Sequence, residues 1–307
     1  MPQEAPEIRS IRQRLKNVSV TLGSTFNETL RLYFLEGFLR RVAASSVQTS
    51  FVLGGAMVLF KIGLGPMQAR HTQDADFSVQ GLPNDAQTIR TLLQTIAGLS
   101  PAPVADELAF DPSSVVVAPI LLAQPQIGLQ ARLSGTLGKA RDTITLDCSF
   151  DPIVPPGPQL RDLPATLPGT LPIPLWTVPL EGIMAGKIES MLRRGATTTR
   201  YKDYWDIARL AEIQTFSGDR VFAALQATCA QHGTQLDPSA EVFASPTFPT
   251  DPLQEANWGH FLARLHSATP SASSFAEVIQ RVRALYRPVI QGSVSGKTWS
   301  PLSRSWQ

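Results

Sequence analysis

The stretch FVLGGAMVLFKIGLGPMQARHTQDADFSV, Phe51 to Val79, predicts a strand ending in paired glycines, a short helix, and a second strand that carries two aspartates. Asp74 and Asp76 are separated by one residue, so on a regular strand both side chains lie on the same face. Two adjacent carboxylates repel each other unless a cation lies between them, which makes this spacing a candidate divalent-metal site. Solvated loop aspartates or a helix cap would show the same pattern.

The residues around this aspartate pair are candidates for binding phosphate. Gly54 and Gly55 have no side chains, so a phosphate can approach their backbone N–H groups. A tight turn from strand to helix would explain the glycines equally well. Arg70 and Thr72 lie just before Asp74, where they either bind phosphate or cap and solvate the loop.

A third carboxylate comes from a later predicted strand, TITLDCSF over 143–150. Alternation on this strand places Ile144, Leu146 and Cys148 toward the core and Asp147 on the opposite face. An aspartate at the centre of a strand is unusual enough to need a reason. Because Mg²⁺ prefers oxygen ligands, Asp147 completes a predicted metal-binding set with Asp74 and Asp76.

The length and composition of the chain exclude several classes of protein. With 307 residues it is long enough for two modest domains or one large one. The two cysteines, Cys148 and Cys229, lie in no CxxC or Cys/His pattern, so neither a zinc site nor a disulfide scaffold is expected. A net charge of +2 means that any nucleic-acid surface must be local. No apolar run reaches membrane-spanning length and Met1–Asn17 is polar, so we expect a cytoplasmic protein without a membrane segment.

The order of predicted elements indicates an α+β fold with two lobes. The first lobe, 1–150, is predicted to hold helices over 8–20, 26–46 and 85–97 and strands over 50–53, 77–79, 115–123, 127–135 and 143–150. Nine prolines fall within 151–179, which we interpret as a linker because neither a helix nor a central strand runs easily through such a stretch. The second lobe, 180–307, is predicted to be a helical bundle that ends in a polar tail over 293–307.

Charged residues gather at the start of the second lobe. Lys187 lies in EGIMAGKIESML, where a lysine is either a surface residue with a buried stem or a catalytic group. Asp203 and Asp206 share a helical face; they either orient Lys187 or offset the helix dipole. Arg200 and Lys202 add to the local positive charge, which would suit a triphosphate.

Several of these motifs together resemble the nucleotidyltransferase-like AbiEii/AbiGii toxin family, which includes the mycobacterial MenT-type toxins. The resemblance runs from about Ile11 to Leu210 and is carried by FVLGGAMVLF, RHTQDADFSV, TITLDCSFDPIVPPGP, PLEGIMAGKIESMLRRG and TTTRYKDYWDI. It implies a polymerase-β-like nucleotidyltransferase lobe followed by a helical lobe. By the same resemblance Gly55 belongs to the glycine motif, Asp74 and Asp76 to the metal-binding pair, and Asp147 to the third acidic position. Lys187 matches the helical lysine, and Arg200, Lys202 and Asp203 match a second charged motif.

The resemblance also implies an activity and partners. An RNA 3′-hydroxyl, expected to be that of a tRNA, would attack the α-phosphorus of an NTP held by Mg²⁺ or Mn²⁺ on the three aspartates, and growth would stop. A cognate antitoxin is expected. A positive track for the RNA backbone would use Arg40, Arg41, Arg193, Arg194 and Arg200. Two alternatives stay open: transfer to a protein or small-molecule acceptor, and a non-catalytic RNA-binding module.

Overall fold

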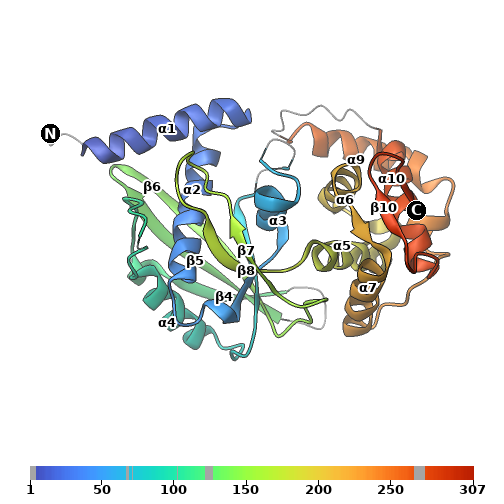
Figure 1. Cartoon of the computed structure of the whole chain (residues 1–307), viewed down its shortest axis with the longest axis horizontal. Coiled ribbons are helices and arrows are strands. Elements are labelled where there is room, and N and C mark those ends of the chain that lie inside the picture. The colour runs from blue at the N-terminus through green and yellow to red at the C-terminus, as the bar shows by residue number, and fades with distance from the viewer. Residues whose placement is uncertain (1–4, 67–68, 71, 102, 122–126, 266–273) are drawn as a thin grey trace. The chain divides into compact units, whose positions relative to one another are not determined.

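The computed structural model describes residues 5–66, 69–70, 72–101, 103–121, 127–265 and 274–307, which form two compact units (Figure 1). Unit 1 takes the described residues of 1–62, 71–152 and 159–177, and unit 2 those of 63–70, 153–158 and 178–307. Among these residues, no helix combines the length and apolar character needed to cross a membrane.

Two long helices open unit 1, and their boundary follows local capping rules. Gly23 ends α1 (Pro6–Leu22) in the left-handed conformation. α2 (Phe26–Ala43) begins with a capping box, in which Thr25 accepts a hydrogen bond from the Glu28 backbone N–H and the Glu28 carboxylate accepts one from the Thr25 backbone N–H. The predicted break between the two helices is therefore confirmed.

Unit 1 is built on one mixed sheet, in the order β3-β5-β6-β2-β1-β8-β7, with β4 pairing to β5. β2 pairs in parallel with β6 and β1 with β8, and the other pairings are antiparallel. The strands are β1 (Phe51–Leu53), β2 (Asp74–Val79), β3 (Ala109–Phe110), β4 (Val116–Leu121), β5 (Ile127–Leu137), β6 (Ala140–Phe150), β7 (Gln159–Leu163) and β8 (Ile173–Thr177). The remaining elements are α3 (Gly55–Val58), α4 (Ala86–Ala97), a π-helical turn over Leu59–Gly63, and 3₁₀ turns over Gln48–Ser50 and Pro112–Ser114.

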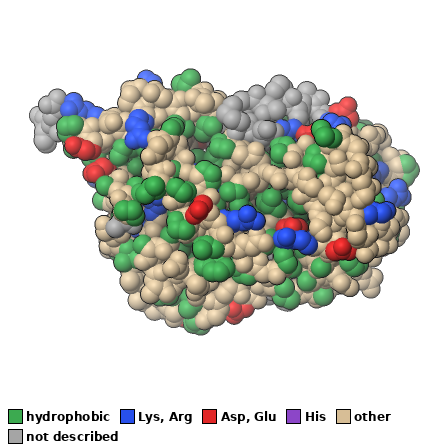
Figure 2. Space-filling model, viewed as in Figure 1, with side chains coloured by type: hydrophobic (Ala, Val, Ile, Leu, Met, Phe, Trp, Pro, Cys, Tyr) green, Lys and Arg blue, Asp and Glu red, His purple; other side chains and the backbone are tan. Residues whose placement is uncertain are grey.

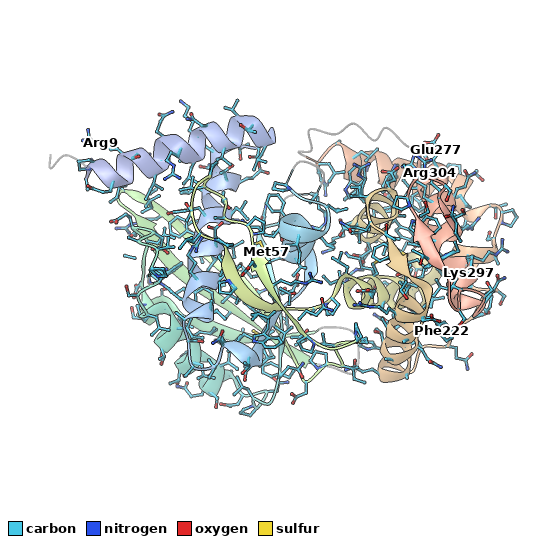
Figure 3. All side chains as sticks on the ribbon, viewed as in Figure 1. Arg9, Met57, Phe222, Glu277, Lys297 and Arg304 are labelled. Atoms are coloured by element: carbon cyan, nitrogen blue, oxygen red, sulfur yellow. The ribbon has the colours of Figure 1, made fainter. Side chains whose placement is uncertain are left out.

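Burial alternates along the central strands, so the sheet has one apolar and one more polar face. On β2, Ala75, Phe77 and Val79 are buried, whereas the residues between them are half-buried. α2 contacts both β6 and β8 and packs against α4. Met57 of α3, labelled in Figure 3, is also fully buried. The α+β class predicted from the element order is confirmed.

The proline-rich stretch 151–179 differs from the predicted linker. β7 and β8 lie inside it and extend the sheet, with β8 placed between β1 and β7. Most of the prolines fall outside these two strands. The proline count over 151–179 therefore concealed two five-residue segments that form strands. On β8, Ile173, Leu175 and Thr177 are buried, and Pro174 is exposed between them. The sheet therefore continues beyond residue 150.

Unit 2 is mainly helical. Its helices are α5 (Leu180–Arg194), α6 (Tyr201–Ile213), α7 (Gly218–His232), α8 (Glu241–Ala244), α9 (Pro252–Leu262) and α10 (Phe275–Ile290), with 3₁₀ turns over Gly195–Thr197 and Phe248–Thr250. Aromatic rings pack in its core: Trp258 contacts Trp205, Tyr201 and Phe275.

The predicted polar tail over 293–307 is instead part of the fold. β10 (Thr298–Ser300) pairs with β9 (Phe216–Ser217) and with β11 (Ser305–Trp306) in a small antiparallel sheet. Trp299 is 1% exposed, and its indole N–H donates to the Ala211 carbonyl at 2.8 Å. The many polar residues around the two tryptophans obscured this short hairpin in the sequence.

Candidate active site

Three carboxylates lie on one face of the sheet in unit 1. In the parallel pairing of β2 with β6, Asp76 lies opposite Asp147 and Asp74 opposite Thr145. Residues paired in this way share a face, and the buried Ala75 and Leu146 point to the other side. The structure therefore places Asp74, Asp76 and Asp147 as the strand pattern predicts, whereas their role in binding a metal stays a prediction.

The paired glycines lie directly against this face. The Gly54 backbone N–H donates to the Asp76 carbonyl at 2.8 Å, so the turn follows the strand pairing. Gly55 begins α3 with φ +60°, and a Cβ built there would lie 1.7 Å from Asp76 Oδ2. Both facts require glycine at position 55, because a side chain would occupy the space of the carboxylate.

Hydrogen bonds orient the carboxylates of Asp74 and Asp147. Thr72 Oγ1 donates to Asp74 Oδ1 at 2.8 Å, and Gln130 Nε2 donates to Asp147 Oδ1 at 2.9 Å. Behind the acidic face, burial raises the pKa of the Cys148 thiol to about 12, and the charges of Asp147 and Asp76 add to this rise. Cys148 is therefore an inert core thiol, as its position in the strand predicts.

The donor set suits Mg²⁺ bound together with a substrate. Among the described residues, no group of three or more His, Cys, Asp or Glu side chains is placed so that it could hold a metal ion by itself. Mg²⁺ usually takes only one or two carboxylates and fills its remaining positions with water and substrate phosphates. The aligned oxygens of Asp74, Asp76 and Asp147 meet that requirement in their chemistry.

A second charged group lies in unit 2, around Lys187. Lys187 Nζ donates to Asp203 Oδ1 at 2.7 Å and to Asp206 Oδ2 at 2.8 Å. Arg200 donates to Asp203 at 2.6 Å, and Arg70 to Asp206 at 3.3 Å. Lys187 is 9% exposed, so its interpretation as a surface lysine is wrong. We call these five residues and Lys202 the Lys187 cluster.

The ion pairs in the Lys187 cluster shift the pKa values of its members. Burial opposes the charge of Lys187, but the adjacent Asp203 and Asp206 outweigh burial and raise its pKa. Burial also opposes ionisation of Asp203, and Lys187 with Arg200 outweighs it and holds the Asp203 pKa well below its usual range. Lys187 and Asp203 therefore form an ion pair in the folded protein.

Lys202 adds to the excess of positive charge in the cluster. Desolvation lowers the pKa of Lys202, and the nearby cations Arg70 and Arg200 lower it further, although the side chain reaches solvent. Four cations face two carboxylates, so two positive charges are in excess. A cluster of this composition favours an anion such as a phosphate.

The predicted positive track loses two of its members. Arg41 is 4% exposed and ion-pairs with Asp106 at 2.7 Å, and Arg40 is 8% exposed and ion-pairs with Glu36 at 3.0 Å. Both arginines therefore stabilise the fold and cannot contact RNA. Arg193 and Arg194 are both exposed, and Arg193 pairs with Glu189. Among the described residues on the face in Figure 2, basic side chains are scattered among acidic and uncharged ones.

Two polar residues on the acidic face were missed in the sequence. Gln130 lies opposite Asp147 on β5, and Arg132 lies opposite Thr145, which in turn is opposite Asp74. Alternation in IGLQARLSG places Gln130 and Arg132 together on the polar side of their strand. Only the register between strands shows that this side faces the aspartates.

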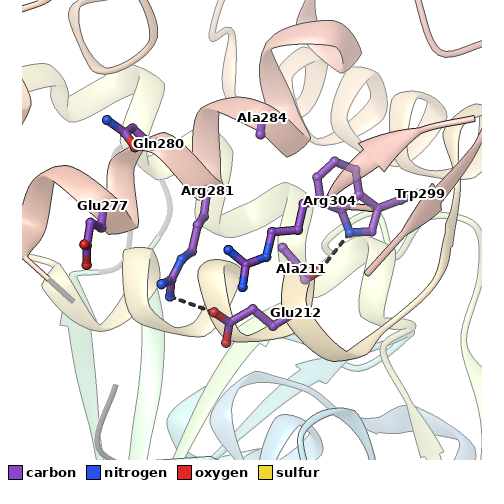
Figure 4. A pocket seen from close by; sticks show the side chains of 8 residues that line it. All are labelled: Ala211, Glu212, Glu277, Gln280, Arg281, Ala284, Trp299 and Arg304. Carbon is purple, nitrogen blue, oxygen red and sulfur yellow. Dashed lines mark hydrogen bonds and ion pairs between the residues drawn. The ribbon is translucent and has the colours of Figure 1, made fainter. Parts of the chain in front are cut away.

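A further cavity, of about 350 Å³, lies in unit 2 at the C-terminal end of α6 (Figure 4). Arg281 and Glu212 in its wall form an ion pair at 2.7 Å, and Trp299 is bonded to the Ala211 carbonyl. Its charged walls include Glu277 and Arg304 as well. None of the residues that line this cavity belongs to the Lys187 cluster.

Comparison with known proteins decides the family. The family model described as "Nucleotidyl transferase AbiEii toxin, Type IV TA system" matches residues 37–281. The chain belongs to this AbiEii family. The family description names nucleotidyltransferase toxins of type IV toxin–antitoxin systems, so this chain is a member of that class, and membership implies a cognate antitoxin. The resemblance predicted from the sequence motifs is confirmed.

Two solved structures are similar to this AbiEii chain. A candidate nucleotidyltransferase of H. pylori shares 12% identity with a TM-score of 0.48, covering 88% of this chain and 97% of that one. JHP933 of Helicobacter pylori shares 12% identity with a TM-score of 0.44, covering 88% and 94%. No curated protein matches the sequence.

Proposed function

We propose that this AbiEii protein transfers a nucleotidyl group from an NTP to RNA, with the 3′ acceptor end of tRNA as its target, in a reaction that requires Mg²⁺ or Mn²⁺. The observation that carries the proposal is the register of β2 on β6, which pairs Asp76 with Asp147 beside the Gly54–Gly55 turn. Carboxylates from neighbouring strands beside a glycine turn also support a polymerase-β-like arrangement of unit 1.

Asp74, Asp76 and Asp147 would hold the metal ion. When bound, the metal polarises the α-phosphate of the NTP and stabilises the charge that develops on the pyrophosphate. Gly54 and Gly55 leave the backbone beside Asp76 bare, and we assign them to contact with the phosphates. Arg70 and Thr72 would act indirectly, because Arg70 is hydrogen-bonded to Asp206 and Thr72 is hydrogen-bonded to Asp74.

The reaction is a single displacement at the α-phosphorus. The acceptor oxygen forms a bond to this phosphorus, and the bond from phosphorus to the bridging oxygen of pyrophosphate breaks. The hydroxyl proton passes to the Asp147 carboxylate, which acts as a general base. Gln130 keeps the Asp147 carboxylate oriented through its 2.9 Å hydrogen bond.

The Lys187 cluster is the candidate phosphate-binding surface. An ammonium group has three hydrogens to donate, and Lys187 uses two of them on Asp203 and Asp206. The third hydrogen, together with Arg200 and Lys202, is suited to a phosphate oxygen. In this account Asp203 is a positioning residue, since it acts through Lys187 and Arg200.

An acceptor assay tests the proposal. Wild type is incubated with each labelled NTP, Mg²⁺, total tRNA and total protein, and Asp76→Ala serves as the inactive control. We expect label on tRNA with one preferred NTP and none with Asp76→Ala. Label only on protein or a small molecule would support a different acceptor. Growth inhibition by Asp76→Ala equal to that by wild type would favour a non-catalytic RNA-binding module.

A further inference from the structure

A second polar cavity lies in unit 1, where β2 begins. It has a volume of about 310 Å³ and is lined by the start of α2, the residues just before β2, and the start of β6. The lining residues used below include Asn27, Arg31, Thr72, Gln73, Arg141 and Asp142. We call this cavity the Arg141 pocket. Its volume is at the lower end of the range for small-ligand sites, which leaves room for about one nucleotide.

The Arg141 pocket adjoins the acidic face. Thr72 is 6% exposed and lines the pocket, and its hydroxyl donates to Asp74 Oδ1 at 2.8 Å. Gln73, the next pocket residue, is the direct chain neighbour of Asp74. A group in the pocket would therefore lie next to the first of the three carboxylates.

The pocket and the glycine turn lie on different sides of β2. The sheet order places β2 between β6 and β1. Gly54 and Gly55 follow β1 and contact Asp76, whereas Arg141 and Asp142 are on β6. Phosphates bound at the glycine turn would thus approach the carboxylates from the β1 side, and a group in the pocket would approach from the β6 side.

Four charged residues line the pocket, Glu28, Arg31, Arg141 and Asp142, and of these only Arg141 has no partner among the described residues. Arg31 forms an ion pair with Asp142, to which it donates two hydrogen bonds of 2.8 and 3.0 Å. Arg141 is exposed and makes no ion pair or hydrogen bond with a described residue. The side-chain amides of Asn27 and Gln73 likewise have no partner among the described residues. One guanidinium with two amides suits a phosphate and the polar edges of a base or ribose.

We infer that the Arg141 pocket holds the terminal nucleotide of the RNA acceptor. This inference rests on the proposed nucleotidyl transfer. In such a displacement the attacking and leaving oxygens lie roughly in line, on opposite sides of the phosphorus. Pyrophosphate on the β1 side therefore requires the acceptor on the β6 side, where this pocket lies.

The test separates acceptor binding from NTP binding. Arg141→Ala and Gln73→Ala are compared with wild type for KM of total tRNA, KM of the incorporated NTP, and Kd of tRNA labelled at its 5′ end. For Arg141→Ala we expect the tRNA KM and Kd to rise about tenfold, with the NTP KM unchanged within twofold. Removal of one phosphate contact also reduces the salt slope of log Kd by about 0.7.

Arg161→Ala is the matched control, because Arg161 is another exposed strand arginine of unit 1 and contacts only Gln159 among the described residues. It should leave all these quantities unchanged. A rise in the NTP KM alone would show that the pocket binds NTP, and an unchanged tRNA Kd would also overturn the inference. Because Kd needs no turnover, weaker tRNA binding without any transfer would contradict only the proposed activity.

Discussion

Lys61 and Lys187 are both buried lysines held by carboxylates, but they differ in how completely they are bonded. Lys61 Nζ donates to Glu36, to the Pro164 carbonyl and to the Thr166 hydroxyl, at 2.9–3.0 Å, and so uses all three of its hydrogens. Among the described residues, Lys187 donates only to Asp203 and Asp206, and it lies among further cations. A lysine whose three ammonium hydrogens are all bonded within the protein stabilises the fold. A lysine with one hydrogen left to donate, beside excess positive charge, can bind a substrate.

The pKa shifts of the two lysines have opposite signs. Burial lowers the pKa of Lys61, and Glu36 only partly offsets it. Around Lys187, burial also acts against the charge, but two carboxylates outweigh it and raise the pKa. The number of carboxylates therefore separates a buried lysine whose pKa falls from one whose pKa rises.

Replacing Lys61 should have the largest effect on stability. Lys61→Met leaves Glu36, which is 1% exposed, with only Arg40 as an ionic partner. Loss of one partner from a buried pair typically costs about 3–5 kcal/mol. Urea unfolding should show this loss, while the transfer rate per folded molecule changes little. A fully folded Lys61→Met protein with no activity would mean that Lys61, too, belongs to the active site.

Replacing Lys187 should instead affect mainly the transfer rate. Lys187→Met removes a charge proposed to contact phosphate, for which a loss of roughly 10²–10³ in rate is typical. Arg200 and Arg70 remain beside Asp203 and Asp206, so the stability loss should be smaller than for Lys61→Met. Single-turnover rates corrected for the folded fraction measure the effect. A normal rate would place Lys187 with Lys61 as a structural residue.

Acid should weaken the Lys187 cluster through Asp203. Because the pKa of Asp203 is lowered in the folded state, its stabilising contribution is complete above its ordinary value of about 4 and is lost as pH falls toward the lowered value. The free energy of unfolding of wild type should therefore fall more steeply below about pH 4 than that of Asp203→Asn. Parallel curves for the two proteins would contradict the ion-paired state of Asp203.

The smallest effect is expected at Gly186, next to Lys187 on α5. A Cβ at this exposed position meets nothing within 4 Å, and alanine favours a helix over glycine by up to about 1 kcal/mol. Gly186→Ala should raise the melting temperature slightly and leave the transfer rate unchanged. Loss of activity would show that the flexibility of α5 matters to Lys187.

The sequence predicted those parts of the site that depend on one strand or one helix. Alternation along a strand is local, so spacing alone predicted that Asp74 and Asp76 share a face and that Asp147 lies on the face opposite to Leu146. It did not predict that Gln130 and Arg132 lie on the same face, since that depends on the register of β5 on β6. It also did not show that Arg40 and Arg41 are buried, because Glu36 and Asp106 become their partners only in the folded unit.

The same difference between local patterns and long-range contacts explains where the predicted fold was wrong. β7 and β8 were hidden by the prolines around them, and the sheet supplies the neighbours that make these short runs stable as strands. Trp299 appeared to lie in a polar tail, but α6 offers the Ala211 carbonyl to its indole N–H. In both regions the decisive partner is distant in sequence.

The central claim is that the paired carboxylates of β2 and β6 perform the transfer. The most direct measurement is the single-turnover transfer rate of Asp76→Asn and Asp147→Asn at saturating NTP and Mg²⁺, with Asp162→Asn as control, since Asp162 is an exposed strand aspartate of the same unit. We predict a loss of at least about 10²-fold for the first two and none for the control. Rates equal to wild type in folded Asp76→Asn and Asp147→Asn would contradict the account.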